Sequence, residues 1–208
     1  MNDAQRRALR ADLLDELDQD FHLTMAHMPN DHINIEHSLY AVHRALDEWR
    51  SNILEPQGTV EEHRILDYIH EGSKWSWIEE YTNRKLAWCG HFLAYCYADI
   101  IKDSIRKKCF PSTYRLRQWA QGTNREIESI ESARAGDILI VGHKKSYGDH
   151  ITLIEKVEDD LSGVWTVEGN AFGETPQASS RKEGVIRRFR AVKDIRFIYR
   201  PLEQDRHV

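Results

Sequence analysis

The chain has 208 residues, of which 40% are hydrophobic and 30% are charged, and its formal net charge is −5. This composition supports one large domain, or one medium domain with an added segment, and argues against a globally disordered chain. The negative charge disfavours a nucleic-acid-binding protein. No run of about eighteen apolar residues is present, so we expect no membrane span.

The first residues lead into a charged, helix-like stretch and not into the apolar core of a signal peptide, so we expect synthesis in the cytoplasm. The three cysteines are too few for a disulfide framework and form no CxxC pair, which predicts reduced thiols and no zinc site. Histidines of the N-terminal half are spaced about five residues apart, which does not place neighbours on one helical face. We therefore predict no metal and no cofactor. These histidines are His22, His27, His32, His37 and His43.

Apolar residues at helical spacing predict four helices in the first half of the chain. We expect two of them over residues 2–28 and 36–54, and a third from a capping box at Thr59 to the residue before Gly72. The fourth covers residues 87–107, and Ser112 is expected to cap a short helix that ends at Trp119.

After a polar, loop-like stretch over residues 121–135, the apolar pattern changes to the alternation typical of strands. A long loop is expected over residues 169–183. The order of helices first and strands afterwards predicts an α+β fold with a small antiparallel sheet of about five strands. The expected strands cover residues 137–141, 150–157, 164–168, 185–189 and 195–199.

The Pro56-Gln-Gly58 break is the best candidate for a boundary between two parts of the chain. We therefore predict a helical N-terminal extension over residues 1–57 and a second domain over residues 58–203.

Cys89 is expected on the first turn of the fourth helix. A thiol at that place is close to unpaired backbone N–H groups and to the positive end of the helix dipole, which favours the thiolate. Cys89 is therefore the candidate nucleophile. We expect Cys96, two turns further along, in the core and Cys109 at the surface.

His150, at the start of a predicted strand, is the candidate partner of Cys89. A cysteine hydrolase needs a histidine within hydrogen-bond reach of the thiol and a third polar group that orients the imidazole. Glu168 and Asn170 lie at the end of the next strand, and either side chain could accept a hydrogen bond from His150. His143 is the weaker alternative because it falls in a turn.

Several segments, in this order, resemble the NlpC/P60 and CHAP superfamily of papain-like cysteine hydrolases. W-C-G-H-F-L at residues 88–93 is similar to its nucleophile motif P-W-C-A-x-F, and G-D-H-I-T-L-I at residues 148–154 is similar to its histidine strand G-H-V-G-I-V. The remaining segments are A-G-D-I-L at 135–139, V-E-G-N at 167–170 and the closing strands at 184–188 and 197–201, which resemble those of a phage- and bacterium-associated branch.

The resemblance implies a papain-like fold and cleavage of amide bonds by Cys89 and His150, without a cofactor. The backbone N–H of Cys89 and a neighbouring donor would stabilise the oxyanion. Motif position favours Asn170 over Glu168 as the orienting residue. The sequence departs from the motif at Asp149, which stands where the family has glycine and could raise the pKa of His150 or recognise a substrate amine.

We expect substrate-binding residues beside the nucleophile. The candidates are Trp88, Trp75, Trp77 and Asp149, although both tryptophans of the connector could equally be core residues. His91 is expected at the surface or at the rim of the site.

The leading functional hypothesis is a hydrolase that cleaves peptidoglycan peptides, as phage lysis enzymes and antibacterial toxins do. Since no signal peptide is recognised, such an enzyme would reach the periplasm or cell wall by a separate route. The alternative is a cytosolic cysteine peptidase or deamidase whose N-terminal helices recognise a protein partner. A third hypothesis is a catalytically inert binding module on the same fold.

Overall fold

The computed structural model describes residues 32–54, 60–72, 87–142, 150–175, 178–201 and 205. Contacts divide the chain into two units, residues 1–33 and 34–208, and the sheet and nearly all of the described helical residues belong to the second. Several predictions lie outside the described residues: the helix over 2–28, the connector with Trp75 and Trp77, and the turn with His143 and Asp149.

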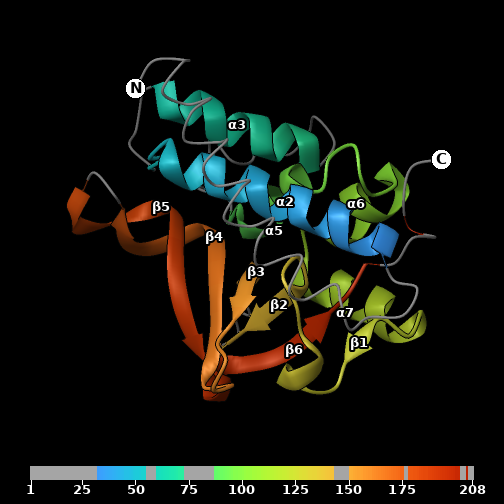
Figure 1. The fold of residues 1–208 in the computed structure, drawn as a ribbon. Coiled ribbons are helices and arrows are strands. Elements are labelled where there is room, and N and C mark those ends of the chain that lie inside the picture. The colour runs from blue at the N-terminus through green and yellow to red at the C-terminus, as the bar shows by residue number, and fades with distance from the viewer. Residues whose placement is uncertain are drawn as a thin grey trace. The chain divides into compact units, whose positions relative to one another are not determined.

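Helices occupy the first part of the described chain, as the sequence predicted (Figure 1). They are α2 (His32–Arg50), α3 (Val60–Gly72), α5 (Cys89–Cys96), α6 (Asp103–Cys109) and α7 (Thr113–Gly122). The predicted cap of α7 is confirmed, because the Ser112 hydroxyl accepts a hydrogen bond from the Arg115 N–H at 3.4 Å.

The single helix predicted over residues 87–107 is wrong. The chain leaves the helix at Cys96 and resumes it at Asp103, so that α5 and α6 are separate elements. Asp99 has a φ of 69°, in the left-handed region that a right-handed helix cannot contain. The apolar spacing continues across this break because Ile100 and Ile101 are buried by tertiary contacts.

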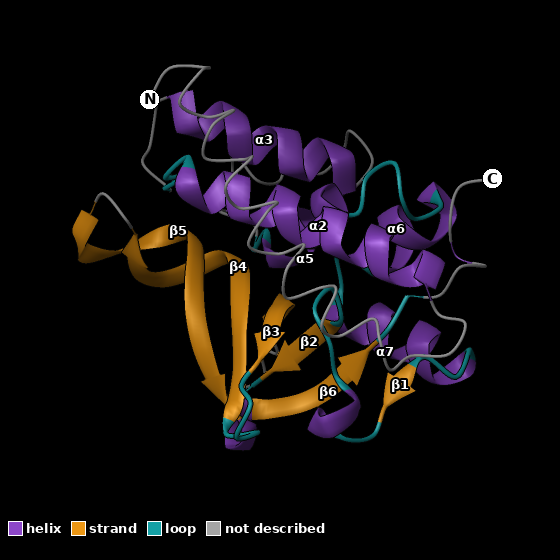
Figure 2. Ribbon diagram, viewed as in Figure 1, coloured by secondary structure: helices purple, strands orange, loops and turns teal. Residues whose placement is uncertain are grey.

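The strands form one antiparallel sheet in the order β1-β6-β2-β3-β4-β5. The α+β prediction is confirmed, and the sheet has one strand more than expected because two residues of the predicted loop, Glu126 and Ile127, pair with β6. Figure 2 shows the strands next to one another and most of the helices gathered on one side of them. The strands are β1 (Glu126–Ile127), β2 (Ile138–Val141), β3 (His150–Val157), β4 (Gly163–Thr175), β5 (Ala178–Ala191) and β6 (Ile195–Tyr199).

The long loop predicted over residues 169–183 is also wrong, because β4 and β5 continue through most of it as one long hairpin. The pairing changes register between Glu168 and Ala171, and Asn170 has a φ of 56°. This local irregularity is a β-bulge, which bends the strand and re-aims its side chains. Part of this segment faces solvent: Phe172 is 56% exposed although it is apolar.

Two apolar groups of residues fix the sheet and the helices. One face of the sheet has a core of Leu139, Val141, Ile154, Val164 and Ile198. The first turns of α5 pack in an aromatic group with α3, in which the Tyr68 ring lies 5.7 Å from the Trp88 ring and 5.2 Å from the Phe92 ring.

Helix α2, which the sequence analysis assigned to the N-terminal extension, is bonded to α3 and α5 through a buried carboxylate. Glu48 accepts hydrogen bonds from Tyr68 Oη at 2.5 Å, Tyr95 Oη at 3.0 Å and Arg64 Nε at 2.8 Å. The Ile53 carbonyl, just after α2, accepts from the Val185 N–H of β5 at 2.8 Å. From residue 34 onward, α2 therefore belongs to the same unit as the sheet.

Candidate active site

Cys89 is the first residue of α5, as the sequence predicted. The helix starts there partly because the bulge of β4 reaches it: Asn170 Oδ1 accepts a hydrogen bond from the Trp88 N–H at 2.9 Å. Gly90 is required by a close approach, since a Cβ at this position would overlap the Phe110 carbonyl oxygen. The thiol therefore lies at the positive end of a helix that is fixed on two sides.

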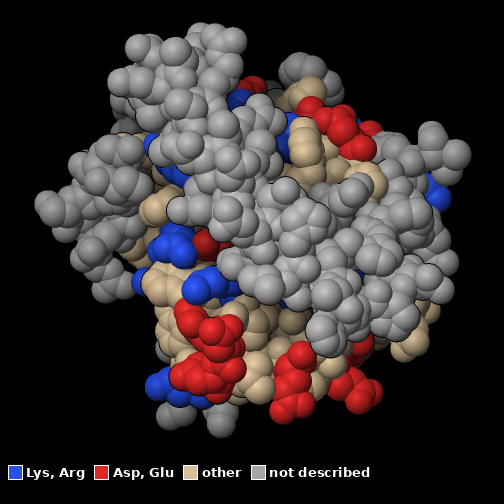
Figure 3. All heavy atoms as spheres, viewed as in Figure 1, with Lys and Arg blue, Asp and Glu red and all other residues tan. Residues whose placement is uncertain are grey.

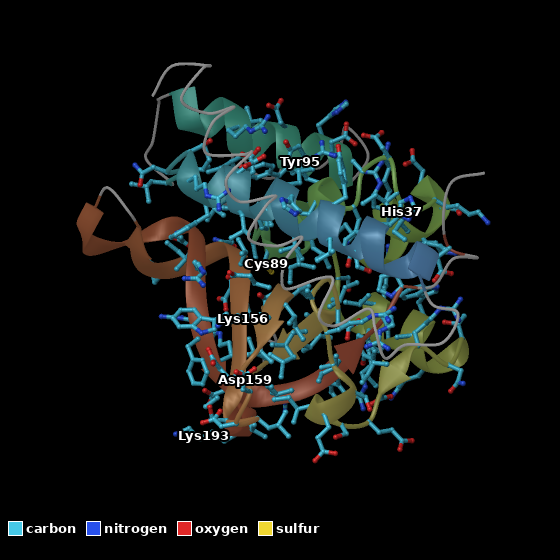
Figure 4. All side chains as sticks on the ribbon, viewed as in Figure 1. His37, Cys89, Tyr95, Lys156, Asp159 and Lys193 are labelled. Carbon is cyan, nitrogen blue, oxygen red and sulfur yellow. The ribbon has the colours of Figure 1, made fainter. Side chains whose placement is uncertain are left out.

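His150 is the first residue of β3 and is hydrogen-bonded to Cys89. It pairs in register with Val141 of β2, which places it at the end of the strand nearest the start of α5. Figure 4 shows Cys89 between the helices and the ends of the strands. The tertiary structure thus joins two residues that lie far apart in the sequence.

Glu168 completes a chain of hydrogen bonds that starts at Cys89. Its Oε2 accepts from His150 Nε2 at 3.1 Å, which leaves Nδ1 as the imidazole nitrogen available to the thiol. The Glu168 side chain is fully buried, whereas that of His150 is 22% exposed. A buried carboxylate in this position fixes the orientation of the imidazole and stabilises its protonated form.

The electrostatics of the three groups favour a thiolate–imidazolium pair. Burial alone would raise the pKa of the Cys89 thiol, but the hydrogen bond and charge of His150, with the backbone of Ile151 and Gly90, hold this pKa below its ordinary value. Burial alone would lower the pKa of His150, but hydrogen bonds with Cys89 and Glu168 raise it to about 9. Each pKa moves in the direction that ionises the pair.

Arg190 and Thr166, in addition to His150, stabilise the ionised form of Glu168. Burial alone would raise its pKa, but His150 and Arg190 lower the pKa to about 2. Arg190 donates from Nε to Oε1 and from Nη2 to Oε2, both at 2.6 Å, and Thr166 Oγ1 donates to Oε1 at 2.7 Å. The buried carboxylate thus accepts four hydrogen bonds, enough to offset the cost of burying its charge.

Asn170, which the motif position favoured as the orienting residue, makes different contacts. Its Oδ1 caps the start of α5, and its Nδ2 donates to Glu183 Oε1 at 2.6 Å. The bulge separates the two candidates: Glu168 still follows the strand alternation on the His150 side, whereas Asn170 is turned towards the start of α5. The structure therefore brings Glu168, and not Asn170, into contact with His150.

Trp88 does not line a surface cleft, contrary to its assignment as a substrate-binding residue. Its side chain is fully buried in the aromatic group with Tyr68 and Phe92. Gly169 lies against it so closely that a Cβ there would overlap Phe92. Trp75, Trp77 and Asp149 lie outside the described residues.

His91 and Cys109 were expected at the surface, and both are buried. The His91 side chain is 1% exposed because Gly72 of α3 approaches it: a Cβ on Gly72 would lie 2.9 Å from His91 Cα. Burial lowers the pKa of His91 to about 4, against a smaller opposite contribution from the Ala87 backbone. Cys96 is fully buried, which confirms the prediction that it belongs to the core.

Sequence reasoning missed Arg190 and Thr166. Arg190 belongs to a cluster of basic residues in β5, with Arg187 and Arg188, that resembles an ordinary solvated strand end. The available signal was strand alternation, because Arg188 and Arg190 share one face and Arg187 lies on the other. On that other face Arg187 pairs with Glu155, with Nε–Oε2 and Nη2–Oε1 distances of 2.6 and 3.0 Å.

Acidic side chains on the face seen in Figure 3 lie in several groups along its lower part, and another group lies near the helices at the top. Asp159, labelled in Figure 4, belongs to the turn between β3 and β4 and lies at the opposite end of the strands from Cys89. Among the acidic residues that the structure describes, Glu168 is hydrogen-bonded to His150, and its side chain lies inside the protein.

Comparisons with protein-family models, with curated proteins and with solved structures find no match to this chain. Within the described ranges, no helix is both long and apolar enough to cross a membrane. The same ranges contain no group of three or more histidine, cysteine and acidic side chains placed to hold a metal ion.

Proposed function

We propose that the protein is a cysteine hydrolase of the papain-like NlpC/P60 and CHAP type, which cleaves amide bonds by acyl transfer. The observation that carries this proposal is the continuous hydrogen-bonded series Cys89–His150–Glu168. A purely structural cysteine requires neither a position at the start of a helix nor a neighbouring histidine that is hydrogen-bonded to a buried carboxylate.

In the proposed mechanism the Cys89 thiolate attacks the carbonyl carbon of the substrate, and the carbonyl oxygen becomes an oxyanion. The N–H of Cys89, at the start of α5, and a neighbouring donor would stabilise this charge. The His150 imidazolium gives its proton to the leaving amine, and a thioester with Cys89 remains. Neutral His150 then removes a proton from water, which hydrolyses the thioester and regenerates the thiol.

Glu168 would keep the imidazole in the productive orientation in both steps. Because Nε2–H is donated to Glu168, the proton exchanged with Cys89 and the substrate is carried by Nδ1. The carboxylate also favours the imidazolium that forms whenever the thiol is ionised.

The papain-like type is supported by the order of the elements. The nucleophile helix precedes an antiparallel sheet, and the histidine begins the strand that follows the A-G-D-I-L segment in that sheet. By the resemblance of its motifs, the proposed substrate is a peptide of peptidoglycan. A wall hydrolase of this kind would be made in the cytoplasm and delivered by a separate route, as a phage or antibacterial enzyme.

The decisive experiment is digestion of purified peptidoglycan by the wild-type protein and by Cys89→Ala, with the fragments identified by mass spectrometry. New fragments from the wild type alone would establish the wall hydrolase, and their masses would name the bond. If the wild type produces none while Cys89 reacts with a thiol probe, the substrate is an intracellular protein and the peptidase or deamidase hypothesis replaces this one. An unreactive Cys89 would indicate the inert binding module.

A further inference from the structure

Arg190 stands behind the proposed catalytic residues, one hydrogen bond further from the thiol than Glu168. It pairs in register with Val164, whereas Glu168 pairs with Ile186, so its guanidinium reaches Glu168 diagonally across the face of the sheet. Both hydrogen bonds to the carboxylate measure 2.6 Å, and the Arg190 side chain is 18% exposed. This is the planar, two-point geometry in which an arginine–carboxylate pair is strongest.

The contact has a consequence for the charge of the whole site. In the ionised state, the Cys89 thiolate and Glu168 are two anions, and the His150 imidazolium and Arg190 are two cations. Charges in this buried group therefore balance, and Thr166 adds a neutral donor. Without Arg190, the same state would carry one net negative charge in a poorly solvated place, which is unfavourable.

We propose that Arg190 is a positioning residue of the Cys89 site, which holds Glu168 ionised against His150 and balances its charge, and thereby sets the pH at which the thiolate forms. This inference rests on the proposed function, since it assigns a role at the same site. The inference goes beyond the proposed function because it assigns control of that pH to a residue other than Cys89, His150 and Glu168.

The direction of the effect follows from the charge balance. When a positive charge is removed, the group retains one more proton, so the thiol beside the imidazolium stays protonated to a higher pH. Loss of the imidazolium proton also moves to higher pH. The groups facing Glu168 from the described elements are His150 on β3, with Cys89 of α5 behind it, and Arg190 on β5. The neighbouring Arg188 carbonyl oxygen lies 3.0 Å from Thr166 Oγ1, which donates its single hydrogen to Glu168.

The test measures the rate at which iodoacetamide alkylates Cys89, from about pH 4 to about pH 10, by mass spectrometry of the peptide that contains it. Arg190→Gln removes the charge but keeps a hydrogen-bond donor. We expect the midpoint of its rate profile to rise by about one pH unit. Arg190→Lys keeps the charge without the two-point geometry, and we expect its midpoint to stay within about 0.3 units of the wild type.

Arg187→Gln is the matched control. It removes an arginine of the same strand that makes the same two-point contact with a carboxylate, Glu155, on the opposite face. Its midpoint should equal that of the wild type. Circular dichroism and urea unfolding would report any loss of folding in each variant.

The outcomes separate this inference from the proposed function. A wild-type Cys89 that is no more reactive than Cys96 or Cys109 at any pH overturns the proposed function, and this inference with it. A reactive Cys89 whose midpoint is unchanged in Arg190→Gln overturns the inference alone. Should Arg190→Gln fail to fold, Arg190→Lys decides, because a midpoint raised by about one unit despite the retained charge contradicts the charge balance.

Discussion

Replacing Glu168 by glutamine tests how strongly the buried carboxylate is bound in the folded protein. Glutamine keeps the size of the side chain and one accepting oxygen. It turns the other oxygen into an NH₂ group that faces the donors of Arg190 or His150. The substitution thus leaves two cationic groups beside a neutral amide, in a place where the side chain has no access to solvent.

The expected magnitude follows from the pKa of Glu168, which folding lowers from a usual 4.5 to about 2. At about 1.4 kcal/mol per pH unit, this difference corresponds to about 3 kcal/mol. The cost of breaking a buried ion pair by removing one partner is similar, about 3–5 kcal/mol. We therefore expect Glu168→Gln to lower the free energy of unfolding by about 3 kcal/mol at pH 7.

The sign of the pH dependence is defined as well. A carboxyl whose pKa is lowered by folding stabilises the protein fully above its unfolded pKa, near 4.5, and loses this contribution as the pH falls towards 2. The difference between wild type and Glu168→Gln should be constant from about pH 5 to pH 6 and should narrow below about pH 4.5.

Urea unfolding followed by circular dichroism at a series of pH values measures this difference. Glu155→Gln is the control, since Glu155 makes the same two-point contact with Arg187 but is 16% exposed, and we expect a loss of about 1 kcal/mol. A loss below about 1 kcal/mol for Glu168→Gln, or one that does not narrow in acid, would refute the argument.

Three further predictions concern residues around the site and the fold. First, Asn170→Ala should destabilise the protein by about 1 kcal/mol more than Asn170→Gly, because both lose the bond to the Trp88 N–H but only alanine is strained at a φ of 56°; equal losses in urea unfolding would contradict this. Second, the pKa of His91 is lowered from 6.5 to about 4, so keeping it neutral contributes about 3 kcal/mol to the free energy of unfolding, which is present above pH 6.5 and lost as the pH falls through 4. His91→Gln should therefore flatten the plot of unfolding free energy against pH in this range, and an unchanged slope would contradict this role of His91. Third, Asp205→Asn should lower the free energy of unfolding by about 3 kcal/mol in the same assay, because it leaves the Arg125 charge buried without its partner: the two side chains are 4% and 5% exposed and hydrogen-bonded at 2.9 and 3.0 Å. The double change Arg125→Met with Asp205→Asn should lower it less than the single change, and an equal or larger loss would show that the unpaired charge of Arg125 is not the cause.

The sequence by itself determined where Cys89 and His150 lie on their own elements. Cys89 at the start of a helix and His150 at the start of a strand are local properties, expressed in the spacing of apolar residues and in the glycines beside them. The order of helices before antiparallel strands is encoded in the same way, which is why the α+β class was predicted correctly.

The tertiary structure decided which groups surround those two residues. Glu168 and Asn170 are two residues apart, and a bulge between them sends one side chain to His150 and the other to the start of α5. Arg190 reaches Glu168 across strands whose register no local pattern specifies. The physical reason is that hydrogen bonds and charges between side chains depend on strand register and helix packing. These become fixed only when the whole unit is folded, whereas the hydrophobic period of each element is already present in the chain.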